Sequence, residues 1–169
     1  MIVVWVVLGL VLLFGLTAFI GAPYVPSHRS ALRKAFSELR PVGADDLVVD
    51  IGSGDGVVLG IVAKRGAKGL GIEINPVLVA ISWLATRRFS GRVKIRLGDL
   101  WQAKFPEQTT VVYAFGESRD IKRMYAKVQN ESNRLGRSID FMSYGFSVPE
   151  HEPAKTGHGF YLYRLNPLQ

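Results

Sequence analysis

Short apolar runs separated by turn residues cover most of this chain. Six of them have the length and residue types of buried strands, and apolar positions between them recur every three or four residues, as on one face of a helix. The expected strands are 47–51, 69–73, 93–97, 111–115, 139–144 and 160–165. The expected helices are 56–65, 76–89 after an Asn75 N-cap, and one from about residue 118 that presents Ile121, Met124, Tyr125 and Val128 on one face. Five strands interleaved with helices and closed by a last strand predict an α/β fold with a doubly wound, mainly parallel sheet.

The first apolar run is much longer than the others. Residues 2–21 contain no charged side chain, and as a helix they would span about 30 Å, the hydrocarbon thickness of a bilayer. A signal peptide and a buried core helix are the alternatives, but no Lys or Arg precedes the run and no clear cleavage site follows it. We therefore expect a transmembrane helix within an anchor that covers residues 1–22.

Basic residues follow this run closely, whereas only the chain amine precedes it. Arg29, Arg33, Lys34 and Arg40 all lie within 20 residues of its end. The positive-inside rule then predicts a single-pass membrane protein whose remaining domain lies on the cytoplasmic side, or on the matrix side in an organelle. The absence of cysteine agrees with a reducing compartment.

A linker and a basic amphipathic helix are expected over residues 23–43. Two prolines stiffen the link, and the helix carries Leu32, Ala35, Phe36 and Leu39 on one face with arginines along its edge. This helix either lies on lipid headgroups with its arginines reaching the phosphates, or is an ordinary domain helix with a solvated basic edge. The α/β domain would occupy residues 44–169.

The chain is strongly basic, with a formal net charge of +7 and a pI near 9.9. Nucleic acid and an anionic membrane surface are the possible partners of such a chain. With an anchor already expected, the membrane is the simpler explanation, and nucleic acid is the less favoured partner. The basic run Arg87, Arg88, Arg92, Lys94 and Arg96 fits a solvated edge strand better than an RNA contact. The three histidines have no ligand spacing, so no metal site is expected.

The first strand ends in an acid and a glycine-rich turn, Asp50-Ile51-Gly52-Ser53-Gly54-Asp55-Gly56. A dinucleotide fingerprint would need glycine at position 57, where this chain has Val57. Asp55 is placed to cap the following helix, so a carboxylate already occupies the helix end that a pyrophosphate would use. The turn therefore favours a nucleoside cofactor without phosphates.

S-adenosylmethionine is such a cofactor. Its ammonium would face Asp50, its carboxylate would meet amides of the turn, and its ribose would bind an acid on the second strand. Glu73 ends that strand, at about the 20-residue spacing expected for a ribose-binding acid. Methyl transfer from a sulfonium to an amine needs alignment and a neutral nucleophile more than an acid/base pair.

Several motifs together resemble a known family. They are Pro23-Tyr24-Val25-Pro26-Ser27 after an apolar helix, the turn from Asp50 to Gly56, Gly71-Ile72-Glu73-Ile74-Asn75-Pro76, and Asp99-Leu100-Trp101. They resemble class I S-adenosylmethionine-dependent methyltransferases, and more narrowly the small membrane-anchored protein-lysine N-methyltransferases that modify the ATP synthase c-ring protein and the adenine nucleotide translocase, with prokaryotic relatives. The resemblance implies a protein substrate, and a short linker to the expected anchor favours a membrane protein.

The resemblance also implies roles for individual residues. It places Asp50, Gly52, Gly54 and Gly56 around the methionine moiety, Glu73 at the ribose hydroxyls, and Asp99 with Leu100 at the adenine. Ser53, Asp55 and Ile74 are further candidate cofactor-binding residues. Candidates for orienting the acceptor lysine are Tyr24, Trp101 and Glu117. Each has an alternative role: Tyr24 packs the linker, Trp101 covers the adenine, and Glu117 favours a helix N-terminus.

Two departures from the family pattern stand out. Phe115-Gly116-Glu117-Ser118 replaces a proline expected soon after the fourth strand. The last helix and strand of a seven-stranded methyltransferase are also not evident, so we expect a fold shortened at the C-terminus. The expected strand order is 3-2-1-4-5, with the final strand antiparallel beside the fifth. Methyltransferases of RNA, lipid or a small hydrophobic molecule, and a non-catalytic cofactor-binding module, are the alternative functions.

Overall fold

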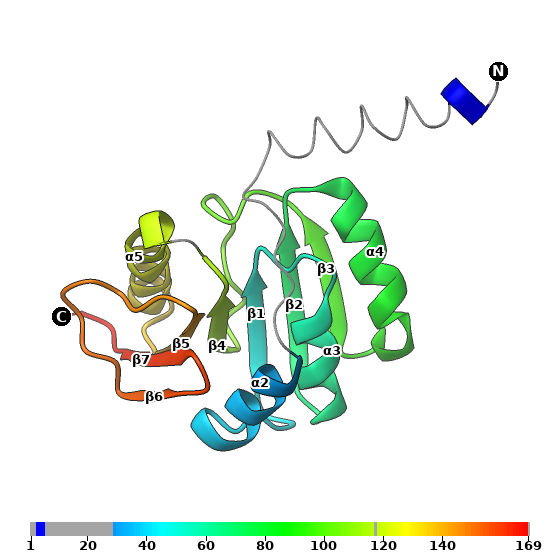
Figure 1. Cartoon of the computed structure of the whole chain (residues 1–169). Coiled ribbons are helices and arrows are strands. Elements are labelled where there is room, and N and C mark those ends of the chain that lie inside the picture. Colours follow the sequence, from blue (N-terminus) through cyan, green and yellow to red (C-terminus); the bar gives the residue numbers. More distant parts are fainter. Residues whose placement is uncertain (1–2, 6–28, 117, 169) are drawn as a thin grey trace.

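The computed structural model describes residues 3–5, 29–116 and 118–168 and shows a seven-stranded sheet between two layers of helix (Figure 1). The strands are β1 (Leu47–Ile51), β2 (Lys68–Glu73), β3 (Val93–Leu97), β4 (Thr109–Ala114), β5 (Ile139–Tyr144), β6 (Lys155–Gly157) and β7 (Phe160–Leu165). The helical elements are α2 (Arg29–Lys34), the π-helical η1 (Ala35–Leu39), α3 (Val57–Lys64), α4 (Pro76–Thr86), the 3-10 turn η2 (Arg87–Phe89) and α5 (Ser118–Leu135).

The sheet order is β3-β2-β1-β4-β5-β7-β6. Strands β1 to β5 are parallel, and β7 runs antiparallel beside β5. The expected order of the first five strands and the antiparallel last strand are therefore confirmed, as are the doubly wound sheet and the edge position of β3.

The expectation of a shortened sheet is wrong, because β6 pairs with β7 and brings the sheet to seven strands. This strand has only three residues, Lys-Thr-Gly, none of them apolar. The sequence of β6 shows no alternation of apolar and polar positions, because β6 lies at the sheet edge and buries no side chain there. Among the described residues, the connection from β5 to β6 contains no helix.

Successive residues of each strand face opposite layers, as the two-residue period of a strand requires. In β1, Val48 packs into a core with α2, η1 and α3, whereas Val49 packs into a second core with α5. The expected inner face of α5 is confirmed, since Ile121, Met124 and Val128 are buried there. Because both faces of the central strands are covered, their sequences are almost continuously apolar.

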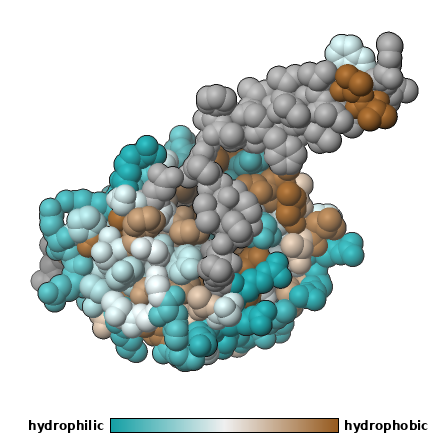
Figure 2. Space-filling model, in the orientation of Figure 1, coloured by the Kyte–Doolittle hydropathy of each residue, from teal (hydrophilic) through white to brown (hydrophobic). Residues whose placement is uncertain are grey.

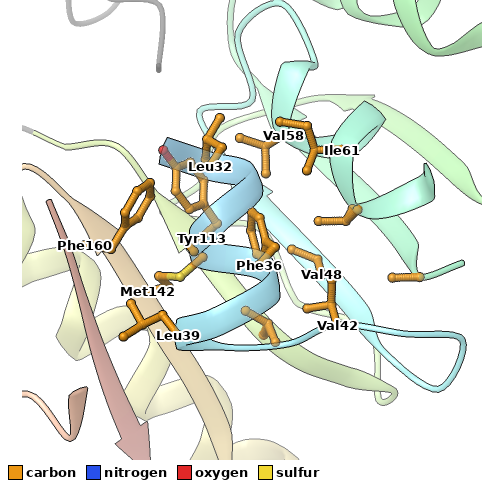
Figure 3. Close-up of a cluster of buried hydrophobic side chains, with 14 of the residues drawn as sticks. Leu32, Phe36, Leu39, Val42, Val48, Val58, Ile61, Tyr113, Met142 and Phe160 are labelled. Carbon is orange, nitrogen blue, oxygen red and sulfur yellow. The ribbon is translucent and has the colours of Figure 1, made fainter. Parts of the chain in front are cut away.

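The helical segment from Arg29 to Leu39 belongs to the domain core. Leu32, Phe36 and Leu39 point into the cluster formed with β1, β4, β5 and β7 (Figure 3). Of the two interpretations of this segment, the structure supports the ordinary domain helix, because its apolar face is already buried against protein and cannot lie on lipid. Arg29 and Arg33 on its edge are exposed.

An ion-pair network fixes the end of this segment at the amino ends of the strands. Arg40 Nη2 lies 2.9 Å from Asp46 Oδ1, and Arg40 Nε lies 2.6 Å from Asp140 Oδ2. Arg164 Nη1 reaches the other oxygen of Asp140 at 2.9 Å. Burial opposes ionisation of Asp46, but hydrogen bonds from Arg40 and Thr110 outweigh it and hold the pKa of that carboxyl below its ordinary value.

No helix within the described part of the chain is long and apolar enough to cross a bilayer. The predicted anchor lies outside the described residues, apart from residues 3–5, which are helical.

Candidate cofactor site

The candidate site lies at the carboxyl ends of the parallel strands. Strands β2 and β3 lie on one side of β1, and β4 and β5 lie on the other side. The direction in which strands are added to the sheet therefore reverses between β1 and β4. In open α/β sheets, ligands bind in the crevice outside such a switch point. Asp50, Glu73 and Asp99 all lie at this edge, at or just after the ends of β1, β2 and β3.

Hydrogen bonds to β2 hold the glycine-rich turn in place. The N–H groups of Gly52 and Ser53 both donate to the Ile72 carbonyl, at 2.8 and 3.2 Å. The Gly54 N–H donates to Glu73 Oε2 at 2.9 Å, and the Gly56 N–H donates to the Ser53 carbonyl. These four amides already donate within the protein, and the expected contact between turn amides and the cofactor carboxylate stays a prediction.

Two of the glycines are required by the geometry. Gly52 has φ +78°, and a Cβ placed on it would meet nothing within 4 Å, so its backbone stays open to a ligand. Gly56 has φ +77°, and a Cβ there would overlap the Ser82 hydroxyl of α4. The first glycine thus exposes backbone to the site, and the last one lets α4 approach the turn closely.

Glu73 is fixed by backbone donors on both carboxylate oxygens. Oε2 accepts from Gly54 and Oε1 accepts from the Asn75 N–H, each at 2.9 Å. The side chain is buried, yet each carboxylate oxygen has a second acceptor position. Glu73 therefore ties the turn to the second strand and keeps capacity to accept from a pair of ligand hydroxyls.

Asp50 is the buried acid at the base of the site. Its side chain is only 2% exposed, and Oδ2 has no hydrogen-bond partner among the described residues. Burial, together with the negative charges of Glu73 and Asp55, raises the pKa of Asp50 well above its ordinary value. None of the described residues places a cation beside an ionised Asp50, and a positively charged ligand group would supply one.

Asp55 and Asn75 cap the two helices that follow the first strands, as expected. Asp55 Oδ1 accepts the Val57 N–H at 3.1 Å at the start of α3. Asn75 Oδ1 accepts the Val77 N–H at 2.9 Å at the start of α4, with Pro76 at the first helical position. Both side chains thus satisfy backbone N–H groups at helix starts that lie at the carboxyl ends of β1 and β2.

The expected adenine side is formed by residues after β2 and β3. Ile74 is exposed next to Glu73, and Leu100 is partly buried against the core beside α5. The Asp99 carboxylate accepts the Trp101 N–H at 2.9 Å and therefore shapes its own turn. Ser53 is buried, and its hydroxyl has no partner among the described residues.

Of the three acceptor-site candidates, only Trp101 lies among the described residues. Its ring packs against the core beside α5, and the Arg123 guanidinium lies 3.8 Å from the ring centroid. One face of the indole therefore already carries a cation, which leaves less of the ring for a substrate lysine. Tyr24 and Glu117 lie outside the described residues.

Two residues at the site were not expected from the sequence. Arg123 covers Trp101 from α5, and no local pattern in the chain signals that long-range contact. Ser82 packs against Gly56, and a signal for it exists: Ser82 and Thr86 are spaced by four in an otherwise apolar helix, which predicts that they share one face. Thr86 is buried with Ser82 and donates to its carbonyl at 2.7 Å.

The chain also matches a known family model, described as the ANTKMT methyltransferase domain, over residues 50–155, which is more than half of its length. The chain belongs to the ANTKMT methyltransferase family. The matched region begins at Asp50 and contains every expected cofactor residue from the glycine-rich turn to Leu100.

Proteins related to this family member include lysine methyltransferases. A protein-lysine N-methyltransferase of Saccharolobus islandicus is 32% identical over 150 residues, which cover 83% of this chain and 92% of that protein. An ATP synthase C-subunit lysine N-methyltransferase of Xenopus laevis is 33% identical over 119 residues, covering 69% and 51%. The human protein of that name is 32% identical over 140 residues, covering 81% and 58%. The chain thus spans about half the length of these vertebrate relatives.

Solved structures show the same fold. An RNA methyltransferase from Salinibacter ruber, in complex with S-adenosyl-L-homocysteine, superposes with a TM-score of 0.75 at 26% identity over 84% of this chain and 94% of that one. A methyltransferase from Geobacter sulfurreducens superposes with a TM-score of 0.58 at 22% identity, covering 83% and 58%. The family member therefore has the Rossmann-like methyltransferase fold.

Proposed function

We propose that this protein binds S-adenosylmethionine and methylates lysine side chains of proteins. The observation that carries the proposal is the pair of acids at the switch point. Asp50 is buried and has no cation beside it in the described part of the chain, and Glu73 is held by two backbone donors. S-adenosylmethionine fits this pair, because it brings an ammonium and a ribose diol on one molecule. The family membership and the names of the relatives support the same function.

The chain's own residues would position the reaction rather than exchange protons. The bound cofactor supplies a methyl group activated by a positively charged sulfur. Asp50 would hold the methionine end and Glu73 the ribose, which fixes the position of the methyl group between them. The acceptor lysine has to be neutral, and a nearby positive charge favours loss of its proton. Alignment of amine and methyl group is then the main task of the protein.

The proposed substrate is a membrane protein with a lysine near the cytoplasmic or matrix surface. The expected linker from Pro23 to Ser27 is five residues long, and when extended it reaches at most about 18 Å. An anchor at residues 1–22 would therefore keep the site near the headgroups. Tethering raises the effective concentration of lysines at the ends of transmembrane helices over lysines of freely diffusing proteins.

A methyltransferase acting on RNA is the second candidate. Lys94 and Arg96 are exposed on β3, and the Salinibacter ruber protein with the same fold is described as an RNA methyltransferase. A basic edge of this kind binds phosphates independently of sequence.

A Glu73→Gln substitution tests the cofactor assignment. It keeps the size of the side chain but removes the charge and one acceptor oxygen. We expect the affinity for S-adenosylmethionine in isothermal calorimetry to fall roughly 10- to 100-fold, since hydrogen bonds to a charged group contribute about 1.5–3 kcal/mol. Glu107→Gln, on an exposed acid away from the site, is the matched control. The assignment would be refuted if the Glu73→Gln protein had the same unfolding temperature as the Glu107→Gln control and bound S-adenosylmethionine with unchanged affinity.

Labelled methyl groups separate the acceptor classes. Membranes and RNA from cells lacking the protein are incubated with the enzyme and methyl-labelled S-adenosylmethionine, and the label is then followed in protein, RNA and lipid. We expect it on lysine in membrane proteins. Label in RNA alone would favour the second candidate, label in extracted lipid would favour a lipid acceptor, and no label despite tight binding would favour a non-catalytic module.

A further inference from the structure

Helix α4 has its polar residues inside and its apolar residues outside. Ser82 and Thr86 are its two buried residues. Ile81, Trp83 and Leu84 are 45%, 63% and 55% exposed. Large apolar side chains that are exposed together on one short helix form a patch, and such patches mark interaction sites.

The glycine-rich turn explains why the polar side faces inward. Gly56 lies so close to α4 that even a Cβ would overlap the Ser82 hydroxyl. Only small residues fit at this contact, so the large apolar residues of α4 lie elsewhere on the helix. Fold packing accounts for Ser82 and Thr86, but it does not account for Trp83 and Leu84.

Positive charges border the apolar residues, without any acid among them. The segment 76–97 contains five basic residues and no Asp or Glu. Arg87, Arg88 and Arg92 follow the end of α4 and are all exposed. Helix α4 forms the outer edge of its layer beside β3 (Figure 1), and hydrophobic residues are visible on this side of the molecule in Figure 2.

A groove of about 350 Å³ continues the basic border between α2, α3 and α4. Its walls include Arg29, Arg33, Lys64 and Arg88, with Asp55 as the acid that lines it in the described part of the chain. Ile81 of α4 also lines this groove. Apolar side chains therefore stand directly beside a cationic recess large enough for a phosphate group.

We propose that this α4 surface, formed by Ile81, Trp83 and Leu84 with Arg87, Arg88 and Arg92, docks on a bilayer that contains anionic phospholipid. The apolar side chains would enter the boundary between headgroups and acyl chains, and the arginines would lie at the phosphates, as in interfacial amphipathic helices. If the uncharged segment 2–21 of the same chain covered the α4 surface instead, it would offer no negative charge to the arginines. A second copy docked through this surface would bring two cationic borders together.

This contact goes beyond the proposed function and does not depend on methyl transfer. Helix α4 begins three residues after Glu73, at the site, and ends before the arginines, at the amino end of β3. A bilayer against α4 would therefore run along the helix, with the arginines at the end far from the site. The α4 surface would thus set the orientation of the domain on the membrane, which a tether alone cannot do.

Single labels on the full-length chain test the contact. The chain has no cysteine, so Leu84→Cys carries one environment-sensitive fluorophore on the α4 surface and Asn130→Cys carries one on exposed α5. Both variants are reconstituted in vesicles of phosphatidylcholine, with or without phosphatidylglycerol. Emission wavelength and quenching by aqueous iodide are measured, and thermal unfolding checks that each variant is folded.

We expect a blue shift and protection from iodide at the Leu84→Cys label only in vesicles with phosphatidylglycerol, and no change at the Asn130→Cys label. Replacing Arg87, Arg88 and Arg92 with Gln should weaken the docking equilibrium about fivefold for each charge removed. A Leu84→Cys label that remains accessible to iodide in the anionic vesicles would overturn the proposal. Equal protection of the Leu84→Cys label in both vesicle types would also overturn the proposal. If that protection does not change with protein concentration, segment 2–21 covers the α4 surface; if it rises with protein concentration, a second copy of the chain does.

Discussion

The buried carboxyl group of Asp50 places stability and ligand binding in conflict at a single residue. Its charged form is desolvated, and Glu73 and Asp55 add repulsion. The same properties make it a good partner for a ligand cation, because an unpaired buried charge gains most from being paired. Sites of this kind commonly reduce the stability of the fold that contains them.

An Asp50→Asn substitution should stabilise the free protein at neutral pH and weaken cofactor binding. The pKa of Asp50 is raised in the folded state, so above the ordinary pKa near 4 the folded protein holds a proton that the unfolded chain has released. The free energy of unfolding of the wild type then falls as pH rises, by up to about 1.4 kcal/mol per pH unit, until the raised pKa is passed. The free energy of unfolding is measured with denaturant at several pH values between about 4 and neutral, in steps of about one pH unit. It should fall with rising pH in the wild type and not in the variant. Parallel curves for the two proteins would contradict it.

Gly56 is the residue at which backbone conformation and helix packing meet. Gly56→Ala should cost about 1–3 kcal/mol, because it places a side chain at positive φ and against Ser82. Ser82→Ala removes the hydroxyl from that contact, so the double variant should recover part of the loss and leave the cost of the positive φ. A double-mutant cycle by thermal or denaturant unfolding measures the coupling. Strict additivity would mean that the Ser82 contact carries none of the cost.

The loop after β3 depends on α5 through a buried acid. Glu131 accepts the Phe105 N–H at 3.1 Å, a hydrogen bond from Lys127 at 2.8 Å and one from Arg134 at 2.6 Å. Arg134 in turn donates to the Phe105 carbonyl. The loop that carries Asp99 and Trp101 is thus fastened at its far end to the helix that carries Arg123.

Glu131→Gln should loosen this loop and destabilise the domain by about 1–3 kcal/mol, since it leaves hydrogen-bonding groups around residue 131 unsatisfied. Burial alone would raise the pKa of Glu131, but hydrogen bonds from Lys127 and Arg134 hold it below its ordinary value. The stabilisation by Glu131 is therefore present above the ordinary pKa near 4.5 and is lost as pH falls through the lowered one. Urea unfolding at neutral and acidic pH, with exposed Glu152→Gln as the control, should show a difference that shrinks in acid.

At the scale of the whole molecule, the basic charge and the expected anchor both favour contact with an anionic membrane surface. The formal net charge of +7 lies entirely outside the uncharged run 2–21. A basic domain tethered to an anionic membrane is drawn toward it, and the attraction weakens with added salt.

Deletion of residues 1–21 should release the protein from membranes. We expect the full-length chain to stay in the membrane fraction through a carbonate wash, which removes proteins held only by surface contacts. The shortened chain should appear in the wash, and calorimetry should show that it still binds S-adenosylmethionine. Full-length protein recovered in the wash would refute the spanning helix.

The sequence by itself determined the elements and the turn at the centre of the fold. Apolar runs of strand length, the Asn75-Pro76 helix start and the alternating glycines after Asp50 are local signals, because they depend on residues adjacent in the chain. The order of the first five strands followed from the resemblance to a known family, and the parallel sheet from the alternation of strands and helices. The three-residue β6 gave no such signal, since pairing with β7 alone defines it.

Only the tertiary structure decided which apolar faces are covered. The pattern over residues 29–39 suggested either lipid or protein as its partner, and the sheet buries it. The pattern of α4 was uniformly apolar, yet its two polar residues face inward because Gly56 leaves room only for small side chains. Asp50 Oδ2, which has no partner among the described residues, and the arginine over Trp101 likewise depend on residues distant in sequence. Periodicity sets which residues share a face, whereas contacts between distant segments set what that face meets.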